Sequence, residues 1–194
     1  MATPHYIHHR DNIEAFLTRR AGAAAAFQEA AQRMKCSLPS ILPGAEVRLE
    51  KNLSEVEGLD RLRMGNSRYI LLELPFIPYK EWMGEEIDNI AYRYSLTPII
   101  AHLDRYEWYT KDEVKGLTER PDTVFQFNCS AFQERRYLKL VLQLIRDGRP
   151  VVVGSDAHNM GERAPRFDAA LKVLRGKLKD GEFTRFEQEG DRLL

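Results

Sequence analysis

Apolar and polar residues follow a helical period near the start of this chain and strand-like runs further on. From Asp11 to Lys35, apolar residues recur every three or four positions, with charged and polar residues between them. This spacing predicts one long helix with a single apolar face, and the alanines at 23–26 favour it further. Asp11 is expected to be the N-cap, because it stands just before the first apolar residue of the pattern.

Short apolar runs predict strands in the rest of the chain. They cover 43–49, 68–76, 98–103, 123–128 and 150–156, and residues 2–6 are typical of the end of a further strand. Helical patterns separate most of them, at 82–95, 111–119, 133–147 and 166–179. Thr110 and Glu113 fit a capping box, and Gly148 stands where a C-cap glycine belongs. Alternating strands and helices predict an α/β fold with a parallel sheet.

The composition is that of an ordinary globular protein. The chain has 194 residues and no repeat, linker or block of charge, so a single domain over residues 1–194 is expected. Basic and acidic residues both number 29, so no net charge favours binding to nucleic acid or to an anionic membrane. No segment has the pattern of a signal peptide or the apolar length of a membrane span. We therefore expect a cytoplasmic protein without membrane insertion.

The two cysteines argue against several kinds of site. Cys36 and Cys129 lie far apart and lack the Cys-x-x-Cys spacing of a structural zinc site, and two cysteines do not make a disulfide framework. Cys129 also lacks the glycine-rich loop with which cysteine phosphatases bind phosphate. A buried structural thiol is therefore expected at Cys129.

Polar residues with metal-binding side chains stand at the ends of the predicted strands. In parallel α/β folds, functional residues gather at the carboxyl ends of the strands. The residues there are His5, Glu46, Glu73, His102, Asn128, Asp156 and His158. Each has a structural alternative, for example an edge carboxylate at Glu73, a core histidine at His102 or a helix N-cap at Asp156. Together, three imidazoles and three carboxylates predict a catalytic site for zinc, manganese or iron.

The segment "VVVGSDAHN", residues 151–159, places two of these side chains close together in sequence. A β-branched run typical of a buried strand ends there on Asp156, a small residue and His158. If the strand continues through both positions, its two-residue period puts the two side chains on the same side. Both are then expected to face one metal cluster.

Six motifs resemble those of a known family when taken in order and at their spacing. They are "ATPHY", "GAEVRL", "YILLELPF", "IIAHLDRY", "QFNCSAF" and "VVGSDAHNMGERAP". They resemble the bacterial PHP-family (polymerase and histidinol phosphatase-like) protein-tyrosine phosphatases of capsular and exopolysaccharide operons. The resemblance extends from Ala2 to about Leu174. It implies a distorted TIM-like barrel of βα units with a metal cluster at the strand ends.

The resemblance also implies roles for particular residues. The implied metal ligands are His5, Glu46, Glu73, His102, Asp156 and His158, holding Mn²⁺ or another divalent transition metal such as Zn²⁺ or Fe²⁺. Arg105 is implied to bind the phosphate of the substrate and Arg163 to make a further substrate contact, since a planar guanidinium matches two phosphate oxygens. A surface charge or an ion pair with Asp104 stays the alternative for Arg105. His102 and Asp156 are both candidates for the acid that protonates the leaving group.

The chain departs from the family pattern at its start. The family opens with a strand ending in Asp-x-His-x-His and a helix, and neither stands before the "ATPHY" motif here. We therefore expect a barrel that is incomplete at the N-terminus, with unpaired strand edges that favour a homo-oligomer. Two imidazoles of the metal site are absent as well. His8 and His9, expected in a loop after His5, are candidate substitutes.

The resemblance implies metal-dependent hydrolysis of phosphotyrosine in a protein, with a bacterial tyrosine kinase of polysaccharide export as the partner. Metal ions would lower the pKa of a water molecule and, with Arg105, offset the negative charge of the phosphate. One alternative is a catalytically impaired binding or scaffold protein. Another is a sequence whose true start lies upstream. A third is a phosphoesterase for a small molecule such as histidinol phosphate.

Overall fold

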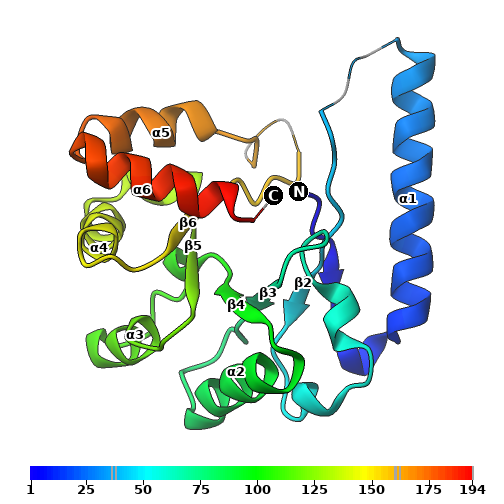
Figure 1. The fold of residues 1–194 in the computed structure, drawn as a ribbon, viewed down its shortest axis with the longest axis horizontal. Helices are drawn as coiled ribbons and strands as arrows, with labels where there is room; N and C mark the ends of the chain where they lie inside the picture. The colour runs from blue at the N-terminus through cyan, green and yellow to red at the C-terminus, as the bar shows by residue number, and fades with distance from the viewer. Residues whose placement is uncertain (36, 38, 160, 162, 194) are drawn as a thin grey trace. The chain divides into compact units, whose positions relative to one another are not determined.

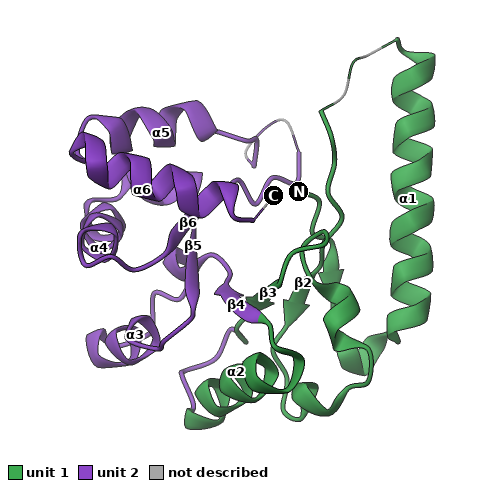
Figure 2. Cartoon of the chain, viewed as in Figure 1, with its two compact units in different colours: residues 1–75, 81–96 green, residues 76–80, 97–194 purple. Residues whose placement is uncertain are grey.

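The computed structural model describes residues 1–35, 37, 39–159, 161 and 163–193, so Cys36 lies outside the described residues. The chain has an α/β fold with six parallel strands, and the strand order β1-β2-β3-β4-β5-β6 follows the order in the sequence (Figure 1). It forms two compact units, residues 1–75 with 81–96 and residues 76–80 with 97–194 (Figure 2). The predicted α/β class with a parallel sheet is confirmed. A single domain and a closed barrel stay predictions.

Among its described residues, the first unit contains three strands and two helices. The strands are β1 (His5–Tyr6), β2 (Glu46–Arg48) and β3 (Tyr69–Glu73), and the helices are α1 (Ile13–Arg33) and α2 (Glu81–Tyr94). Three short 3-10 turns, η1 (His8–Arg10), η2 (Leu53–Glu55) and η3 (Leu59–Leu62), complete it. The strands pair in parallel, with His5 opposite Glu46 and Arg48 opposite Glu73. Every residue of β3 is buried, as expected for a strand covered on both faces.

Helix α1 confirms the long helix that the apolar spacing predicts, but its cap differs by one residue. The side-chain oxygen of Asn12 accepts a hydrogen bond from the Ala15 N–H at 2.8 Å, which is the N-cap arrangement. Asp11 instead forms an ion pair with Arg19. The predicted cap at Asp11 is therefore wrong, because the neighbouring asparagine carries an equally suitable acceptor.

The described part of the second unit contains three strands and four helices. The strands are β4 (Thr97–Ile100), β5 (Val124–Asn128) and β6 (Val151–Gly154), and the helices are α3 (Lys111–Thr118), α4 (Arg135–Arg146), α5 (Phe167–Arg175) and α6 (Asp180–Asp191). Two 3-10 turns, η4 (Leu103–Arg105) and η5 (Cys129–Gln133), follow β4 and β5. Strand β5 pairs in parallel with both β4 and β6. The fully buried Phe125 and Phe127 place β5 in the core of this unit.

The local signals at two helix ends of this unit are confirmed. Thr110 and Glu113 form the reciprocal hydrogen bonds of a capping box, at 3.2 and 2.7 Å. Gly148 has φ +73°, the left-handed conformation that favours glycine after a helix. The sequence pattern does not predict helix α6. Only Phe183 and Phe186 are buried in it, and two apolar residues make a weak helical pattern.

Several strands end earlier than the sequence predicts, and in β4 and β6 this moves the site residues out of the strand. Strand β4 stops at Ile100 and β6 at Gly154, so His102, Asp156 and His158 all follow a strand instead of belonging to one. His102 has φ +32° and Asp156 has φ +46°, values that a non-glycine residue seldom adopts. The two-residue period of a strand therefore does not govern Asp156 and His158, and the strand predicted through both residues is wrong. Their side chains nevertheless lie together, with Nδ1 of His158 3.6 Å from Oδ1 of Asp156. A turn of the backbone sets their positions.

No helix in the described part of the chain combines the length and the apolar character needed to cross a membrane. The helical turn η1 occupies the place of the loop expected after His5, and it carries both His8 and His9.

Candidate active site

Three metal-binding side chains lie together in the first unit. His5 from β1, Glu46 from β2 and Glu73 from β3 each offer a ligand atom, and these atoms all lie within 4.8 Å of one another. Neighbouring parallel strands bring them together, and Nδ1 of His5 lies 3.6 Å from Oε1 of Glu46. We call this group the His-Glu-Glu cluster.

The burial of the His-Glu-Glu cluster fits a bound cation. Glu46 and Glu73 are each only 7% exposed, whereas the His5 side chain is 48% exposed. Two carboxylates close together and away from water are unfavourable unless a cation offsets their charge. One imidazole and two carboxylates form a donor set that suits zinc, manganese or iron. The cluster therefore fits a divalent transition-metal ion. The exposed His5 side leaves such an ion accessible from solvent.

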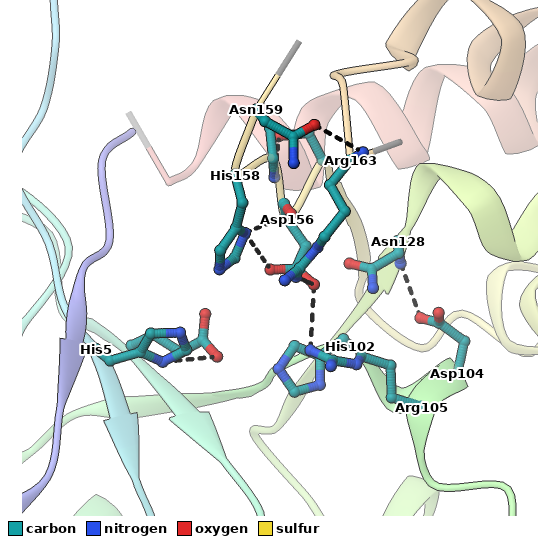
Figure 3. Close-up of polar contacts among 12 residues, drawn as sticks. His5, His102, Asp104, Arg105, Asn128, Asp156, His158, Asn159 and Arg163 are labelled. Atoms are coloured by element: carbon teal, nitrogen blue, oxygen red, sulfur yellow. Dashed lines mark hydrogen bonds and ion pairs between the residues drawn. The ribbon is translucent and has the colours of Figure 1, made fainter. Parts of the chain in front are cut away.

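In the second unit, the Asp156 carboxylate joins two arginines and a histidine (Figure 3). Its Oδ2 accepts hydrogen bonds from Nη1 of Arg105 at 3.2 Å and from Nη2 of Arg163 at 2.5 Å. Nδ1 of His158 lies 3.6 Å from Oδ1 and 3.0 Å from the carbonyl oxygen of Asp156. The Asp156 side chain is 10% exposed, while both arginines remain partly open to water. One largely buried carboxylate thus holds two guanidinium groups side by side despite their like charge.

The segment after β6 is folded by an asparagine that the sequence reasoning missed. Oδ1 of Asn159 accepts hydrogen bonds from the N–H groups of Gly161 at 2.9 Å and Arg163 at 3.1 Å. The His158 N–H in turn donates to the Arg163 carbonyl at 3.1 Å. These bonds bring Arg163 back toward Asp156 (Figure 3). The sequence signal was Asn159 followed two residues later by a glycine, which is typical of an Asx turn.

Gln126 is a second residue that the sequence reasoning missed. Its Oε1 accepts a hydrogen bond from the His102 N–H at 2.5 Å, and its Nε2 donates to Oδ1 of Asn128 at 3.1 Å. His102 is 1% exposed, and its ring lies nearly parallel to that of Phe76, with the centroids 6.2 Å apart. A polar residue inside the apolar run "VFQFN" was the available signal. Gln126 supports the left-handed backbone at His102.

Arg105 pairs with Asp156, and Asp104 has another role. Oδ1 of Asp104 accepts a hydrogen bond from the Asn128 N–H at 2.8 Å, joining η4 to the end of β5 (Figure 3). Burial raises the pKa of the Asp104 carboxyl group above its usual value, although this hydrogen bond acts in the opposite direction. The guanidinium of Arg105 lies over the ring of Phe76, with 5.2 Å from its central carbon to the centroid.

A pocket of about 720 Å³ opens over these groups within the second unit. Its lining includes Arg105, Asn128, Asp156, Arg163, Arg166, Phe76 and Trp108. Three arginines line it together with four acidic residues, Asp104, Glu107, Glu134 and Asp156. The guanidinium groups of Arg105 and Arg163 on Asp156 supply the paired donors that suit an anion such as phosphate. Cys129 also lines it, but the thiol is buried and burial raises its pKa, so it is a poor nucleophile. The burial of Cys129 agrees with the structural role that the sequence predicts for this thiol.

Comparison with known proteins now places the chain in a family. Residues 1–189 match the family model described as capsular polysaccharide synthesis, CpsB/CapC. The chain belongs to the CpsB/CapC family. A comparison with curated proteins finds no match. Among solved structures, the chain is similar to one described as "Crystal structures of YwqE from Bacillus subtilis and CpsB from Streptococcus pneumoniae, unique metal-dependent tyrosine phosphatases".

This structural likeness supports the fold of the CpsB/CapC chain. The TM-score is 0.67 at 20% sequence identity, and the match covers 89% of this chain and 71% of the other. At such identity the likeness establishes the α/β fold. The predicted membership in a family of capsular polysaccharide synthesis is confirmed by the family match.

The predicted site residues of this CpsB/CapC chain fall into two groups. The first unit holds His5, Glu46 and Glu73, and the second holds His102, Arg105, Asp156, His158 and Arg163. Their roles as ligands, phosphate-binding groups or acids stay predictions. His9 pairs with Glu50, and Nδ1 of His8 lies 3.2 Å from the Tyr6 hydroxyl. Within the described residues, neither histidine belongs to a three-donor group that could hold a metal.

Proposed function

We propose that this CpsB/CapC protein is a metal-dependent phosphoester hydrolase that acts on phosphotyrosine in a protein. The observation that carries the proposal is the His-Glu-Glu cluster, a partly open donor set built from the ends of three parallel strands. The pocket lined by Arg105 and Arg163 supports it, because it suits the second requirement of the reaction, an anion-binding site. A structural neighbour described as a metal-dependent tyrosine phosphatase supports it further.

His5, Glu46 and Glu73 would hold the divalent ion, which is manganese by family resemblance with zinc or iron as alternatives. His102, Asp156 and His158 are the further ligands that we propose from the same resemblance. When bound, such an ion lowers the pKa of water and offsets negative charge on a phosphoryl group.

Arg105 and Arg163 would bind the equatorial oxygens of the phosphate. Asp156 already holds the two guanidinium groups beside each other, so little reorganisation is needed when phosphate arrives. Hydrolysis forms a bond from water oxygen to phosphorus and breaks the bond from phosphorus to the tyrosine oxygen. The leaving oxygen then takes a proton, and the proposed donor is His102 or Asp156, whichever of the two does not bind the ion.

The finer family features belong to the same proposal. They are the PHP type of barrel and a tyrosine kinase of polysaccharide export as the phosphoprotein substrate. Self-association and a cytoplasmic location are proposed with them.

The test is hydrolysis of a phosphotyrosine peptide with and without added Mn²⁺. We expect turnover that requires the metal and falls about 100-fold or more in Glu73→Gln and in Arg105→Ala. Glu85→Gln, which changes an exposed carboxylate of α2, is the matched control and should retain full activity. A folded parent chain without metal-dependent turnover would favour a binding or scaffold protein. Hydrolysis of histidinol phosphate alone would favour the small-molecule alternative.

A further inference from the structure

Two large aromatic side chains lie partly exposed on the wall of the arginine-lined pocket. Phe76 is 41% exposed and Trp108 is 45% exposed, and both line the pocket. Their ring centroids are 5.9 Å apart, with the planes inclined by 61°. Neighbouring apolar side chains exposed in a pocket are typical of a ligand site, because burying them against a ligand is favourable. The mechanism above uses neither residue.

Contacts from behind hold both rings in place. The indole N–H of Trp108 donates to the Ile77 carbonyl at 3.0 Å, which ties the segment 76–80 to this wall. Tyr106, only 2% exposed, lies behind them, with its centroid 5.8 Å from that of Phe76 and 6.2 Å from that of Trp108. Rings that are already ordered lose little conformational entropy when a ligand binds.

The aromatic wall and the anion-binding groups meet at one residue. The Arg105 guanidinium lies over the Phe76 ring and also donates to Asp156, the carboxylate that Arg163 shares. An anion held by Arg105 therefore lies next to an aromatic surface. A ligand with an aromatic ring attached directly to its phosphate oxygen can contact both at once, whereas an alkyl phosphate leaves the rings exposed.

We infer that Phe76 and Trp108 form an aryl subsite that selects aryl phosphomonoesters over alkyl phosphomonoesters. The inference rests on the proposed function, because it assigns the part of the substrate that the proposed hydrolase recognises. Each ring contributes through stacked or edge-to-face contacts with the phenyl group, an effect of about 3- to 10-fold in affinity. Phosphotyrosine has the required ring, and phosphoserine does not.

The first experiment compares kcat/KM for a phosphotyrosine peptide and a phosphoserine peptide of otherwise identical sequence. Phe76→Leu should lower the tyrosine-to-serine ratio about tenfold, with the phosphoserine value nearly unchanged, and Trp108→Leu should act in the same direction. Phe27→Leu, at a 51% exposed phenylalanine of α1, is the matched control and should keep the parent ratio. An unchanged ratio in both pocket variants overturns the inference, as does an equal loss for both peptides.

A binding measurement separates this inference from the proposed function. Calorimetric titration of the full chain with phenylphosphonate and with methylphosphonate requires no turnover. We expect the phenyl compound to bind more tightly to the parent chain, and this advantage to shrink about tenfold in Phe76→Leu. A parent chain that shows this preference but hydrolyses no phosphoester refutes the proposed function and leaves the aryl subsite standing. A parent chain that hydrolyses the phosphotyrosine peptide but binds the two phosphonates equally refutes the aryl subsite and leaves the proposed function standing.

Discussion

A Cβ atom placed on Gly154 would come within 2.5 Å of Nε2 of Gln126, so the end of β6 lies directly against a side-chain amide of β5. The same amide accepts the His102 N–H and donates to Asn128. One buried glutamine therefore joins the ends of β4, β5 and β6, and glycine at 154 leaves the space that it needs. The groups proposed to act on phosphate lie on segments that begin at these strand ends.

Replacement of this glycine is expected to destabilise the protein. Gly154→Ala forces the Gln126 amide to move, which should lower the free energy of unfolding by about 1–3 kcal/mol. Gly116→Ala is the control in the same unit, because its Cβ would meet no atom within 4 Å. It lies inside α3 and should raise stability by up to about 1 kcal/mol. Urea denaturation measures the free energy of unfolding of both variants. Equal stability of the two variants would show that a Cβ atom is tolerated at position 154 as well as at position 116.

Loss of the glutamine should affect both stability and activity. Gln126→Leu removes the acceptor of the His102 N–H inside the core, at a cost of about 1–3 kcal/mol in unfolding free energy. Turnover of phosphotyrosine should fall as well, because His102 loses part of the support for its backbone conformation. Gln28→Leu, on an exposed position of α1, should change the free energy of unfolding by less than about 0.5 kcal/mol. Full stability in Gln126→Leu would contradict the role assigned to this hydrogen bond.

Metal binding should stabilise the folded chain through the His-Glu-Glu cluster. Mn²⁺ at about 100 times its dissociation constant is expected to add about 2.7 kcal/mol to the free energy of unfolding. Glu46→Gln should lose most of this increment, while the exposed Glu85→Gln keeps it. Each variant is measured by thermal denaturation with metal and with chelator, so that its own change in stability cancels. The same metal increment in Glu46→Gln and in the parent would place the ion elsewhere.

The alkaline limb of the stability profile should depend on Tyr109. Burial, with smaller contributions from Tyr79 and Glu113, raises the pKa of the Tyr109 hydroxyl above its usual value near 10. The folded chain therefore keeps this proton at a pH where the unfolded chain loses it. The resulting stabilisation is fully present below about pH 10 and is lost as the pH rises toward the folded pKa.

The Tyr109→Phe variant lacks this titration. Between pH 8 and pH 11, the free energy of unfolding of the parent chain should fall relative to that of Tyr109→Phe. Tyr92→Phe, at a residue that is 91% exposed, should show no such change relative to the parent. Urea denaturation at the two pH values gives the comparison, and a difference between parent and Tyr109→Phe that does not vary with pH would contradict it.

Local sequence patterns correctly predicted some features of this protein. The capping box of Thr110 and Glu113 involves residues three positions apart, and the burial of β5 follows from its own apolar run. No local pattern predicts the backbone conformations of His102 and Asp156. A left-handed backbone at a histidine or an aspartate depends on packing and hydrogen bonds from elsewhere in the chain.

The sequence by itself determined the α/β class, the family and the candidate donors at the strand ends, because periodicity, caps and motifs depend on residues near one another in the chain. Only the tertiary structure decided that Asp156 pairs with Arg105 and that Gln126 supports His102. These contacts join residues 51 and 24 positions apart. Their geometry follows from how the strands pair and where each strand ends, which no local pattern specifies.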